Sequence, residues 1–183
     1  ERLPSAEDGS QREVLVDVSR LQLLAGELLD LARVDGAGRS PFTARLDLGA
    51  LVADELARYN DERLSVVVTE AWVVADAALL VRLVRNLVDN AVRHAGLRAQ
   101  VSVTIEGDMA HLRVSNDGEP IPEQDLARIF EPFTRLDEAR ANDDGGAGLG
   151  LSIARSVAEV HGGTLLAEPC AEGATFVATL PLA

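Results

Sequence analysis

The sequence is poor in cysteine and in positive charge, and it has no long apolar run. Its single cysteine, Cys170, excludes an internal disulfide and any metal site built from several cysteines. The net charge of −13 argues against broad binding to nucleic acid or to an anionic membrane, because both need positive charge to neutralise phosphate. No apolar stretch approaches the roughly 20 residues of a membrane helix. Pro4, Glu7 and Asp8 stand where the apolar part of a signal peptide would lie. We therefore expect a soluble chain that binds polyanions only through local arginines, backbone N–H groups or a divalent cation.

The chain has 183 residues with 47% hydrophobic content, which is enough for one well-buried domain plus a modest appendage. Residues 1–10 have no periodicity and are expected to form a loop. Ser10 and Glu13 form a capping box that predicts a helix from Ser10 to Asp35, ended by Gly36. Apolar residues recur along it at steps of four and three, at Val14, Val18, Leu21, Ala25, Leu28 and Ala32. Together with flanking leucines they predict a helix that packs against a partner.

After a linker at 36–41, short strands and helices alternate. Strands are predicted at 42–46, 64–69, 72–75, 101–106, 112–115, 164–167 and 175–180. Helices are predicted at 48–59, from Asp76 to about His94, from Pro122 to Phe130, and up to His161. Gly107 and Asp108 predict a hairpin between two of the strands. The fold class is therefore an α/β two-layer sandwich with one mixed, mostly antiparallel sheet.

Three segments carry polar or glycine residues suited to chemistry. On the helix after Asp76, Asn86 and Asn90 lie one turn apart opposite an apolar stripe, and amide oxygens suit a hard cation whose phosphates already bring negative charge. On this helix alone, ordinary solvated amides are the simpler interpretation. The turn at 115–122 contains Gly118, which lets the backbone approach a ligand closely, although a simple turn explains it equally well.

The third segment, residues 145–151, places glycines just before a helix. Free N–H groups and a positive dipole end at a helix N-terminus bind phosphate oxygens well. The segment is not a P-loop, because no Lys-Ser or Lys-Thr follows the glycines.

The order of these segments is more specific than any one of them. Residues 86–94 (NLVDNAVRH) resemble the N box of sensor histidine kinases, 116–122 (NDGEPIP) their first glycine box, 130–135 (FEPFTR) their phenylalanine box and 146–151 (GAGLGL) their second glycine box. Residues 161–163 and 173–176 resemble the family's closing turns. From Ser10 to Leu182, the chain thus resembles sensor histidine kinases of two-component systems, within the GHKL superfamily.

The resemblance implies the Bergerat fold, with ATP and Mg²⁺ bound under a lid at 136–146. Carried over by position, Asn86 and Asn90 would hold Mg²⁺, Arg93 would lie near the phosphates, and Arg135 would meet the γ-phosphate. Asn86 and Arg135 would be the catalytic residues. The full nucleotide-contact set implied in this way is Asn86, Asn90, Arg93, His94, Asn116, Asp117, Gly118, Ile121, Phe133, Arg135, Gly146, Ala147, Gly148, Leu149, Gly150, Leu151 and Thr175.

The resemblance also divides the chain and implies its partners. Residues 1–10 would be a loop remnant, 11–36 the second helix of an incomplete dimerisation and histidine-phosphotransfer domain, and 37–183 the catalytic ATP-binding domain. A homodimer through this helix and the missing one is implied, as is a cognate response regulator. The resemblance implies neither nucleic-acid binding nor direct membrane contact by this fragment. The fragment would be the cytoplasmic portion of a membrane-anchored protein.

Two features depart from the family. None of His94, His111 and His161 stands in a phosphoacceptor motif, so the γ-phosphoryl is expected to go to a histidine on a helix absent from this chain. Asn116 replaces the Asp that usually accepts a hydrogen bond from adenine, and Pro120 replaces a glycine. Asn still offers an oxygen but has lost the charge, so the contact with ATP is expected to weaken and discrimination against GTP to narrow. Asp117 could restore the carboxylate, although adjacent residues near a strand end normally point to opposite sides.

Two alternatives remain open from the sequence. One is an ATP-binding regulatory module of the same fold that does not turn over ATP, against which Asn86, Asn90 and Arg135 argue. The other is an anti-sigma-type protein kinase, which would lack the leucine-rich helix at Ser10–Asp35.

Overall fold

The computed structural model describes residues 43–136 and 148–183. The predicted helix at Ser10–Asp35, most of the lid at 136–146, and the site residues Gly146 and Ala147 therefore lie outside the described residues. The elements in chain order are β1 (Ala44–Asp47), α2 (Leu48–Leu56), β2 (Leu64–Val68), β3 (Trp72–Ala75), α3 (Ala77–His94), β4 (Ala99–Glu106), β5 (Met109–Asn116), the 3-10 turns η1 (Glu123–Asp125) and η2 (Arg128–Phe130), α4 (Gly150–Val160), β6 (Thr164–Glu168) and β7 (Ala174–Pro181). No helix within these described ranges is long and apolar enough to cross a membrane.

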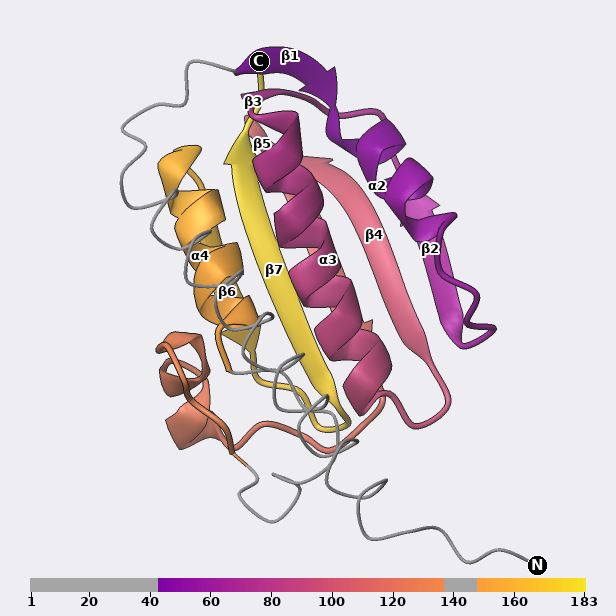
Figure 1. The fold of residues 1–183 in the computed structure, drawn as a ribbon, viewed down its shortest axis with the longest axis vertical. Helices are drawn as coiled ribbons and strands as arrows, with labels where there is room; N and C mark the ends of the chain where they lie inside the picture. The colour runs from indigo at the N-terminus through magenta and orange to yellow at the C-terminus, as the bar shows by residue number, and fades with distance from the viewer. Residues whose placement is uncertain (1–42, 137–147) are drawn as a thin grey trace, which may run out of the picture.

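The main sheet has five strands in the order β2-β4-β5-β7-β6. Only β2 and β4 are parallel, and the other neighbours are antiparallel. Helices α2, α3 and α4 cover one face of this sheet (Figure 1). The predicted two-layer α/β sandwich with a mixed, mostly antiparallel sheet is thus confirmed.

The hairpin of β4 and β5 forms where Gly107 and Asp108 predicted it. Its register runs from Ala99 opposite Asn116 to Glu106 opposite Met109, and Gly107 has a φ of 62°. Both strands extend beyond the predicted 101–106 and 112–115. Pairing with β7 on the other side of β5 supplies backbone partners along its whole length, and this pairing is not visible in local sequence.

A second, two-stranded sheet was not foreseen from the sequence. β1 and β3 pair antiparallel, with Ala44 opposite Ala75. The Asp47 carboxylate holds this region together, because it accepts hydrogen bonds from the N–H groups of Gly49 and Ala71, each at 2.9 Å. One acidic side chain therefore caps α2, as predicted, and also fixes the start of β3.

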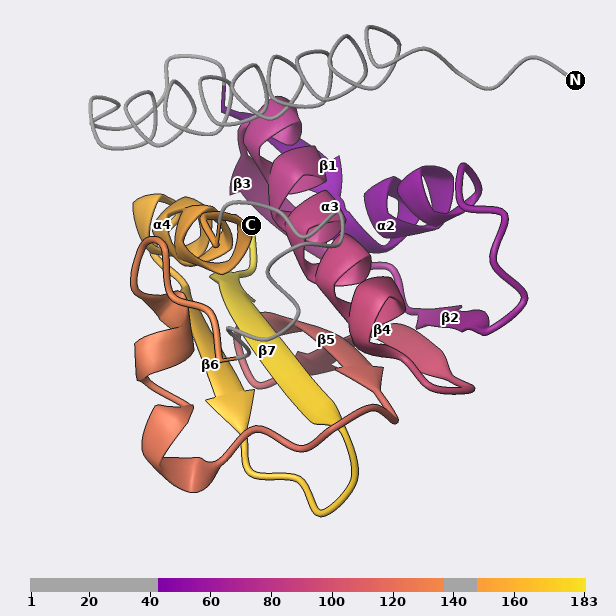
Figure 2. The ribbon, with the colours of Figure 1, turned by 60° about the horizontal axis from the view of Figure 1, so that its bottom comes forward.

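Helix α3 lies at the centre of the helical layer (Figure 2). It begins after Asp76, whose carboxylate accepts from the N–H groups of Ala78 (2.9 Å) and Leu79 (3.3 Å), and it ends shortly before Gly96. Its buried residues are the predicted stripe of Leu80, Leu83, Val84, Leu87, Val88 and Ala91. The cap, the stripe and the stop were all predicted correctly from local pattern.

Helix α4 is joined to α3 through the histidine that follows it. His161 Nδ1 lies 2.7 Å from the carbonyl oxygen of Val157, and Nε2 accepts from the N–H of Asp76 at 3.0 Å. Because a carbonyl can only accept, the ring carries its proton on Nδ1. Both ring nitrogens of His161 are thus occupied by structural bonds.

The predicted helix from Pro122 to Phe130 is wrong. Two separate 3-10 turns, η1 and η2, occupy this stretch. Ile129 and Phe130 at its end are buried, and the Phe130 ring packs edge-on against Phe176 with centroids 6.3 Å apart. Packing of these two side chains therefore fixes the backbone more strongly than the tendency to form a continuous helix.

Candidate functional site

The polar face of α3 meets the N-terminus of α4. A Cβ added at Gly150, the first residue of α4, would lie 3.5 Å from Asn86 Oδ1, so the Asn86 amide faces this helix end directly. Asn86 Nδ2 is buried without a hydrogen-bond partner in the described part of the chain. The residue before Gly150, Leu149, provides no side-chain cap for α4. The first N–H groups of α4 and the Asn86 amide together make a polar junction between two helices, suited to an anionic group and its cation.

Asn90 and Arg93 continue this face towards the end of α3. Asn90 is half-buried, whereas Arg93 and His94 are exposed in the last turn. The structure therefore brings Asn86, Asn90 and Arg93 onto successive turns of one helix, as predicted.

A backbone hydrogen bond joins Phe133 and Gly148, the two residues that flank the segment 134–147. Phe133 N–H donates to the carbonyl of Gly148 at 3.0 Å. Both residues have positive φ, 66° for Phe133 and 77° for Gly148, and a Cβ at Gly148 would lie 3.0 Å from Phe133 C and Thr134 O. Positive φ costs a non-glycine residue roughly 1–2 kcal/mol, so the strain at Phe133 marks a position set by its surroundings. Phe133 itself is 59% exposed.

The turn after β5 is packed tightly against the end of α3. A Cβ at Gly118 would lie 1.9 Å from the carbonyl oxygen of His94, and one at Gly173 would lie 1.8 Å from that of Asn116. Only glycine fits at either position. Asn116 between them is 6% exposed, and its Oδ1 accepts from the Gly118 N–H at 3.0 Å. Its Nδ2 is buried and has no partner among the described residues.

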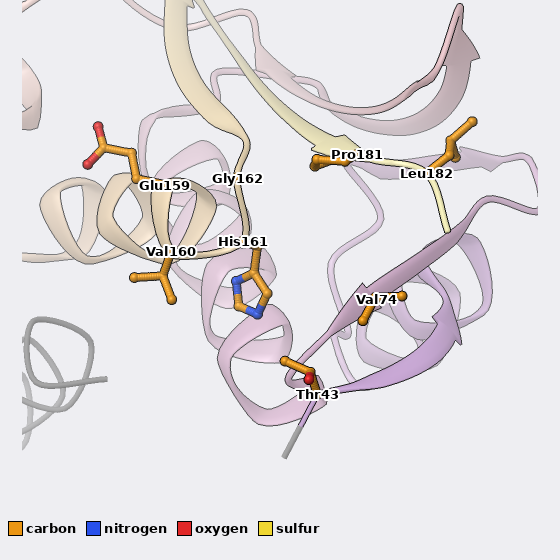
Figure 3. Close-up of a pocket in the computed structure, with 8 residues that line it drawn as sticks. All are labelled: Thr43, Val74, Glu159, Val160, His161, Gly162, Pro181 and Leu182. Carbon is orange, nitrogen blue, oxygen red and sulfur yellow. The ribbon is translucent and has the colours of Figure 1, made fainter. Parts of the chain in front are cut away.

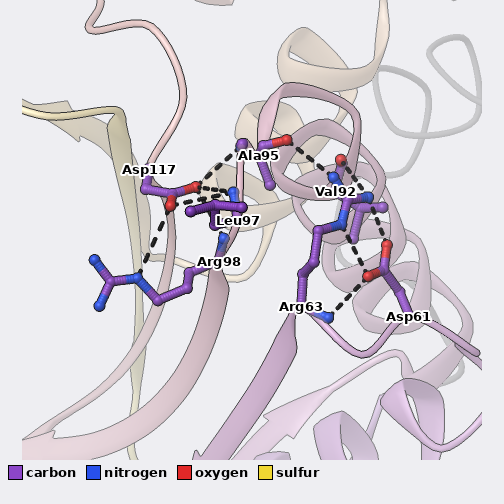
Figure 4. A network of polar contacts seen from close by, with 8 residues as sticks. Asp61, Arg63, Val92, Ala95, Leu97, Arg98 and Asp117 are labelled. Atoms are coloured by element: carbon purple, nitrogen blue, oxygen red, sulfur yellow. Dashed lines mark hydrogen bonds and ion pairs between the residues drawn. The ribbon is translucent and has the colours of Figure 1, made fainter.

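The Asp117 side chain binds the loop between α3 and β4 (Figure 4). Its carboxylate accepts from the N–H groups of Arg98 (2.9 Å), Leu97 (3.0 Å) and Gly96 (3.0 Å). These bonds, that from Arg98 first, hold the pKa of Asp117 below its usual range. The carboxylate is therefore already committed to backbone donors.

Arg63 is a residue that sequence reasoning missed. It donates to the carbonyls of Ala95 (2.9 Å) and Val92 (3.3 Å) at the C-terminus of α3, and its guanidinium is held by Asp61 (Figure 4). A cation at this end satisfies free carbonyls and complements the helix dipole. No signal in the sequence points to it, because Arg63 lies about 30 residues before the carbonyls that it caps.

The structure places Thr175 away from Asn116. Thr175 pairs with Ser115 in the sheet, and Asn116 pairs with Ala174, so the Thr175 side chain lies on the opposite sheet face from Asn116. The alternation around buried Phe176 could have shown this from the sequence. Ile121, Leu149 and Leu151 contribute to the core or pack against it. Arg135 is half-buried, close to the end of the first described range.

A hollow of about 600 Å³ lies at the other end of α4 (Figure 3). It is lined by Thr43, Val74, Glu159, Val160, His161, Gly162, Pro181 and Leu182. Its one histidine has both ring nitrogens occupied, and Glu159 is paired with Arg155 at 2.9 Å. His161 and Glu159 in the hollow are thus already paired, and the junction of Asn86 with Gly150 lies at the opposite end of α4.

Comparison with known proteins gives the class to which these features belong. Residues 75–183 match the family of histidine kinase-, DNA gyrase B- and HSP90-like ATPases. The chain therefore belongs to this ATPase family, and the expected fold and ATP-binding character are confirmed.

Individual relatives narrow the class. The chain is 37% identical to the sensor protein CzcS of Cupriavidus metallidurans over 178 residues, which are 93% of this chain and 37% of that protein. Its structure is similar to the mycobacterial sensor histidine kinase MprB, with 30% identity and a TM-score of 0.65 over 76% of this chain and 97% of that one. It is also similar to the ATP-binding domain of PrrB from Mycobacterium tuberculosis, with 28% identity and a TM-score of 0.62 over 78% and 98% of the two chains. The chain thus contains a catalytic ATP-binding domain of the sensor histidine kinase type, and it spans less than half the length of the first curated relatives.

Proposed function

We propose that this chain binds Mg·ATP and transfers the γ-phosphoryl group to a histidine on a helix outside the chain. The observation that carries the proposal is the junction of Asn86 with the N-terminus of α4, for which Leu149 provides no side-chain cap. A free helix N-terminus favours phosphate, and an amide beside it supplies a neutral oxygen for the accompanying cation.

The donor set fits Mg²⁺ that arrives with the nucleotide. Within residues 43–136 and 148–183, no three His, Cys, Asp or Glu side chains form a cluster able to hold a metal alone. Asn86 and Asn90 would hold the ion through their amide oxygens while the phosphates supply the negative charge. When bound, Mg²⁺ would neutralise charge on the phosphates.

The protein's contribution to transfer is positioning and charge neutralisation. Arg93 and Arg135 are proposed to face the phosphates, with Arg135 at the γ-phosphate. The bond between the γ-phosphorus and the oxygen bridging it to the β-phosphate breaks, a phosphorus–nitrogen bond to the acceptor histidine forms, and ADP leaves.

We propose that the acceptor is not one of the chain's own histidines. His161 is held by two structural bonds, and His111 lies on β5 within the sheet. His94 ends α3, where its carbonyl lies against Gly118. A helix bearing the acceptor would pair with residues 11–36 in a homodimer, on the cytoplasmic side of a membrane-anchored protein. A response-regulator aspartate would then take the phosphoryl group.

The test mixes the chain with Mg·[γ-³²P]ATP and a separately supplied helical hairpin bearing a candidate histidine. We expect acid-labile label on the hairpin and none on the chain itself. Asn90→Ala should abolish labelling and weaken Mg·ATP binding by about tenfold or more, because one hydrogen bond to a charged group contributes roughly 1.5–3 kcal/mol.

Asn60→Ala is the matched control, since Asn60 is an exposed amide outside the site, and it should label normally. Label on the isolated chain, or acid-stable label on serine, would contradict the proposal. If titration calorimetry gives the same Mg·ATP affinity for Asn90→Ala as for the parent, Asn90 does not belong to the site.

A further inference from the structure

Arg63 joins the last turn of α3 to the main sheet. Its guanidinium donates to the carbonyl oxygens of Ala95 at 2.9 Å and Val92 at 3.3 Å (Figure 4). The backbone carbonyl of Arg63 accepts from the N–H of Ala99, the first residue of β4, at 2.9 Å. One residue therefore binds the end of the helix with its side chain and the start of a central strand with its backbone.

Asp61 keeps the Arg63 guanidinium in this orientation. Its carboxylate accepts from Arg63 Nε at 3.0 Å, from Nη2 at 2.6 Å and from the Arg63 backbone N–H at 2.9 Å. A planar guanidinium bound along one edge to a carboxylate has little freedom to rotate, so its other N–H groups point in fixed directions. The bonds from Arg63, those of the side chain first, lower the pKa of Asp61 to about 2, so the pair is charged at neutral pH.

Asp117 binds the residues that follow the helix end. Its carboxylate accepts from the N–H groups of residues 96–98, and its own N–H donates to the carbonyl of Arg98 at 3.1 Å. Residues 92–98 are thus bound through carbonyl groups by Arg63 and through N–H groups by Asp117. Two side chains from different parts of the sheet together fix the position of this segment.

The segment carries part of the proposed nucleotide site. Arg93 and His94 lie between the two carbonyls that Arg63 binds, and Asn90 stands one turn or less before them. A Cβ added at Gly118 would lie 1.9 Å from the carbonyl oxygen of His94, so the turn after β5 packs directly on this helix end. The spacing between Asn90 and that turn therefore depends on where the last turn of α3 is held.

Building on the proposed nucleotide function, we propose that Arg63 is a positioning residue for Mg·ATP, which holds the end of α3 at a fixed spacing from the turn at 116–118. Its side-chain bonds go to backbone carbonyls and to Asp61, so it acts through the helix end and not on the ligand. Without these donors the carbonyls need water instead, and a helix end without such bonds frays. Binding then has to order this turn, which weakens affinity without removing a contact from the bound state.

The experiment measures Mg·ATP binding by titration calorimetry on the parent chain, Arg63→Met and Arg63→Lys. Methionine keeps a long unbranched side chain but donates no hydrogen bond, so Arg63→Met should raise the Kd at least about tenfold with unchanged stoichiometry. Lysine keeps a cationic donor but lacks the planar fork, so Arg63→Lys should raise the Kd by about threefold, less than Arg63→Met.

Arg113→Met is the matched control. Arg113 also donates two hydrogen bonds to one carboxylate, that of Glu168, and its side chain is 44% exposed against 37% for Arg63. It lies on β5 and binds no helix end. Its replacement should leave the Kd for Mg·ATP within about twofold of the parent value.

The labelling assay with the supplied hairpin separates positioning from folding. A positioning role raises the KM for Mg·ATP at unchanged kcat, because saturating nucleotide orders the helix end. Partial unfolding of Arg63→Met would instead lower kcat and the calorimetric stoichiometry at unchanged KM and Kd, and that result would overturn the inference.

The remaining outcomes are equally distinct. If the parent binds Mg·ATP and a folded Arg63→Met binds it equally well, the inference fails and the proposed function stands. The inference also fails if Arg113→Met loses as much affinity as Arg63→Met. If Arg63→Met does not fold, Arg63→Lys decides, and a Kd equal to that of the parent would overturn the inference. Absence of Mg·ATP binding by the parent would overturn the proposed function and this inference together.

Discussion

Gly150→Ala separates binding from folding at the junction of α3 and α4. The added Cβ would meet Asn86 at 3.5 Å from Oδ1, 3.8 Å from Cγ and 3.9 Å from Cβ, all ordinary van der Waals contacts. The helix therefore accepts the methyl group. Alanine is up to about 1 kcal/mol more favourable than glycine inside a helix, so the free energy of unfolding should stay level or rise, with a Tm gain of up to roughly 2–4 °C.

Nucleotide binding should change in the opposite direction. The methyl group would cover Asn86 Oδ1, the atom proposed to face the cation and phosphates. Loss of one charge-assisted contact costs about 1.5–3 kcal/mol, or roughly 10- to 150-fold in the Kd for Mg·ATP. Thermal unfolding without nucleotide and titration calorimetry with Mg·ATP measure the two effects separately.

Gly162→Ala provides the control at the opposite end of α4. Gly162 has a φ of 75°, and a Cβ there would meet only Pro181 at 3.6 Å. Its cost is therefore conformational, roughly 1–2 kcal/mol of stability with no direct effect on affinity. If Gly150→Ala folds normally and binds Mg·ATP within twofold of the parent, Asn86 does not face the nucleotide and the reasoning fails.

Two further predictions concern pH. Asp117 has a lowered pKa in the folded chain, so its contribution to stability is present above its unfolded pKa and is lost as the pH falls through the folded pKa. Asp117→Asn should therefore be less stable than the parent at neutral pH. Chemical unfolding should show this difference in stability shrinking below about pH 4. Tyr59 donates to Asp89 at 2.7 Å, and burial followed by this bond raises its pKa. The contribution of Tyr59 to stability is present below its unfolded pKa and declines above about pH 10. The free energy of unfolding of Tyr59→Phe should therefore fall less steeply at alkaline pH than that of the parent. An equally steep fall in both chains would contradict this.

The sequence predicts best where the signal is local. The Asp76 cap, the apolar stripe of α3 and the stop at Gly96 all lie within one stretch of about five helical turns, and the structure reproduces each of them. The Gly107 hairpin is equally local. The nucleotide-binding fold followed from the order of several such segments.

The remaining features depend on contacts between distant parts of the chain. Pairing of β1 with β3 joins strands on either side of α2 and β2, and the split into η1 and η2 accompanies burial of Phe130 against Phe176. Arg63 reaches the end of α3 from an earlier loop. The Thr175 prediction shows a different limit, because a shift of one residue along a strand moves a side chain to the other sheet face.

The hydrogen bond from the Asp76 N–H to His161 joins helices α3 and α4 at one end of the pair. The N-terminus of α3 and the C-terminus of α4 are joined there, and Gly150 at the other end of α4 lies beside Asn86 in the middle of α3. Because this bond joins the helices at one end, a change of angle between α3 and α4 would alter the spacing at Asn86 and Gly150 more than the spacing at His161. His161 contacts none of the proposed ligand-binding residues, yet it holds one end of the helix pair that carries Asn86 and Gly150.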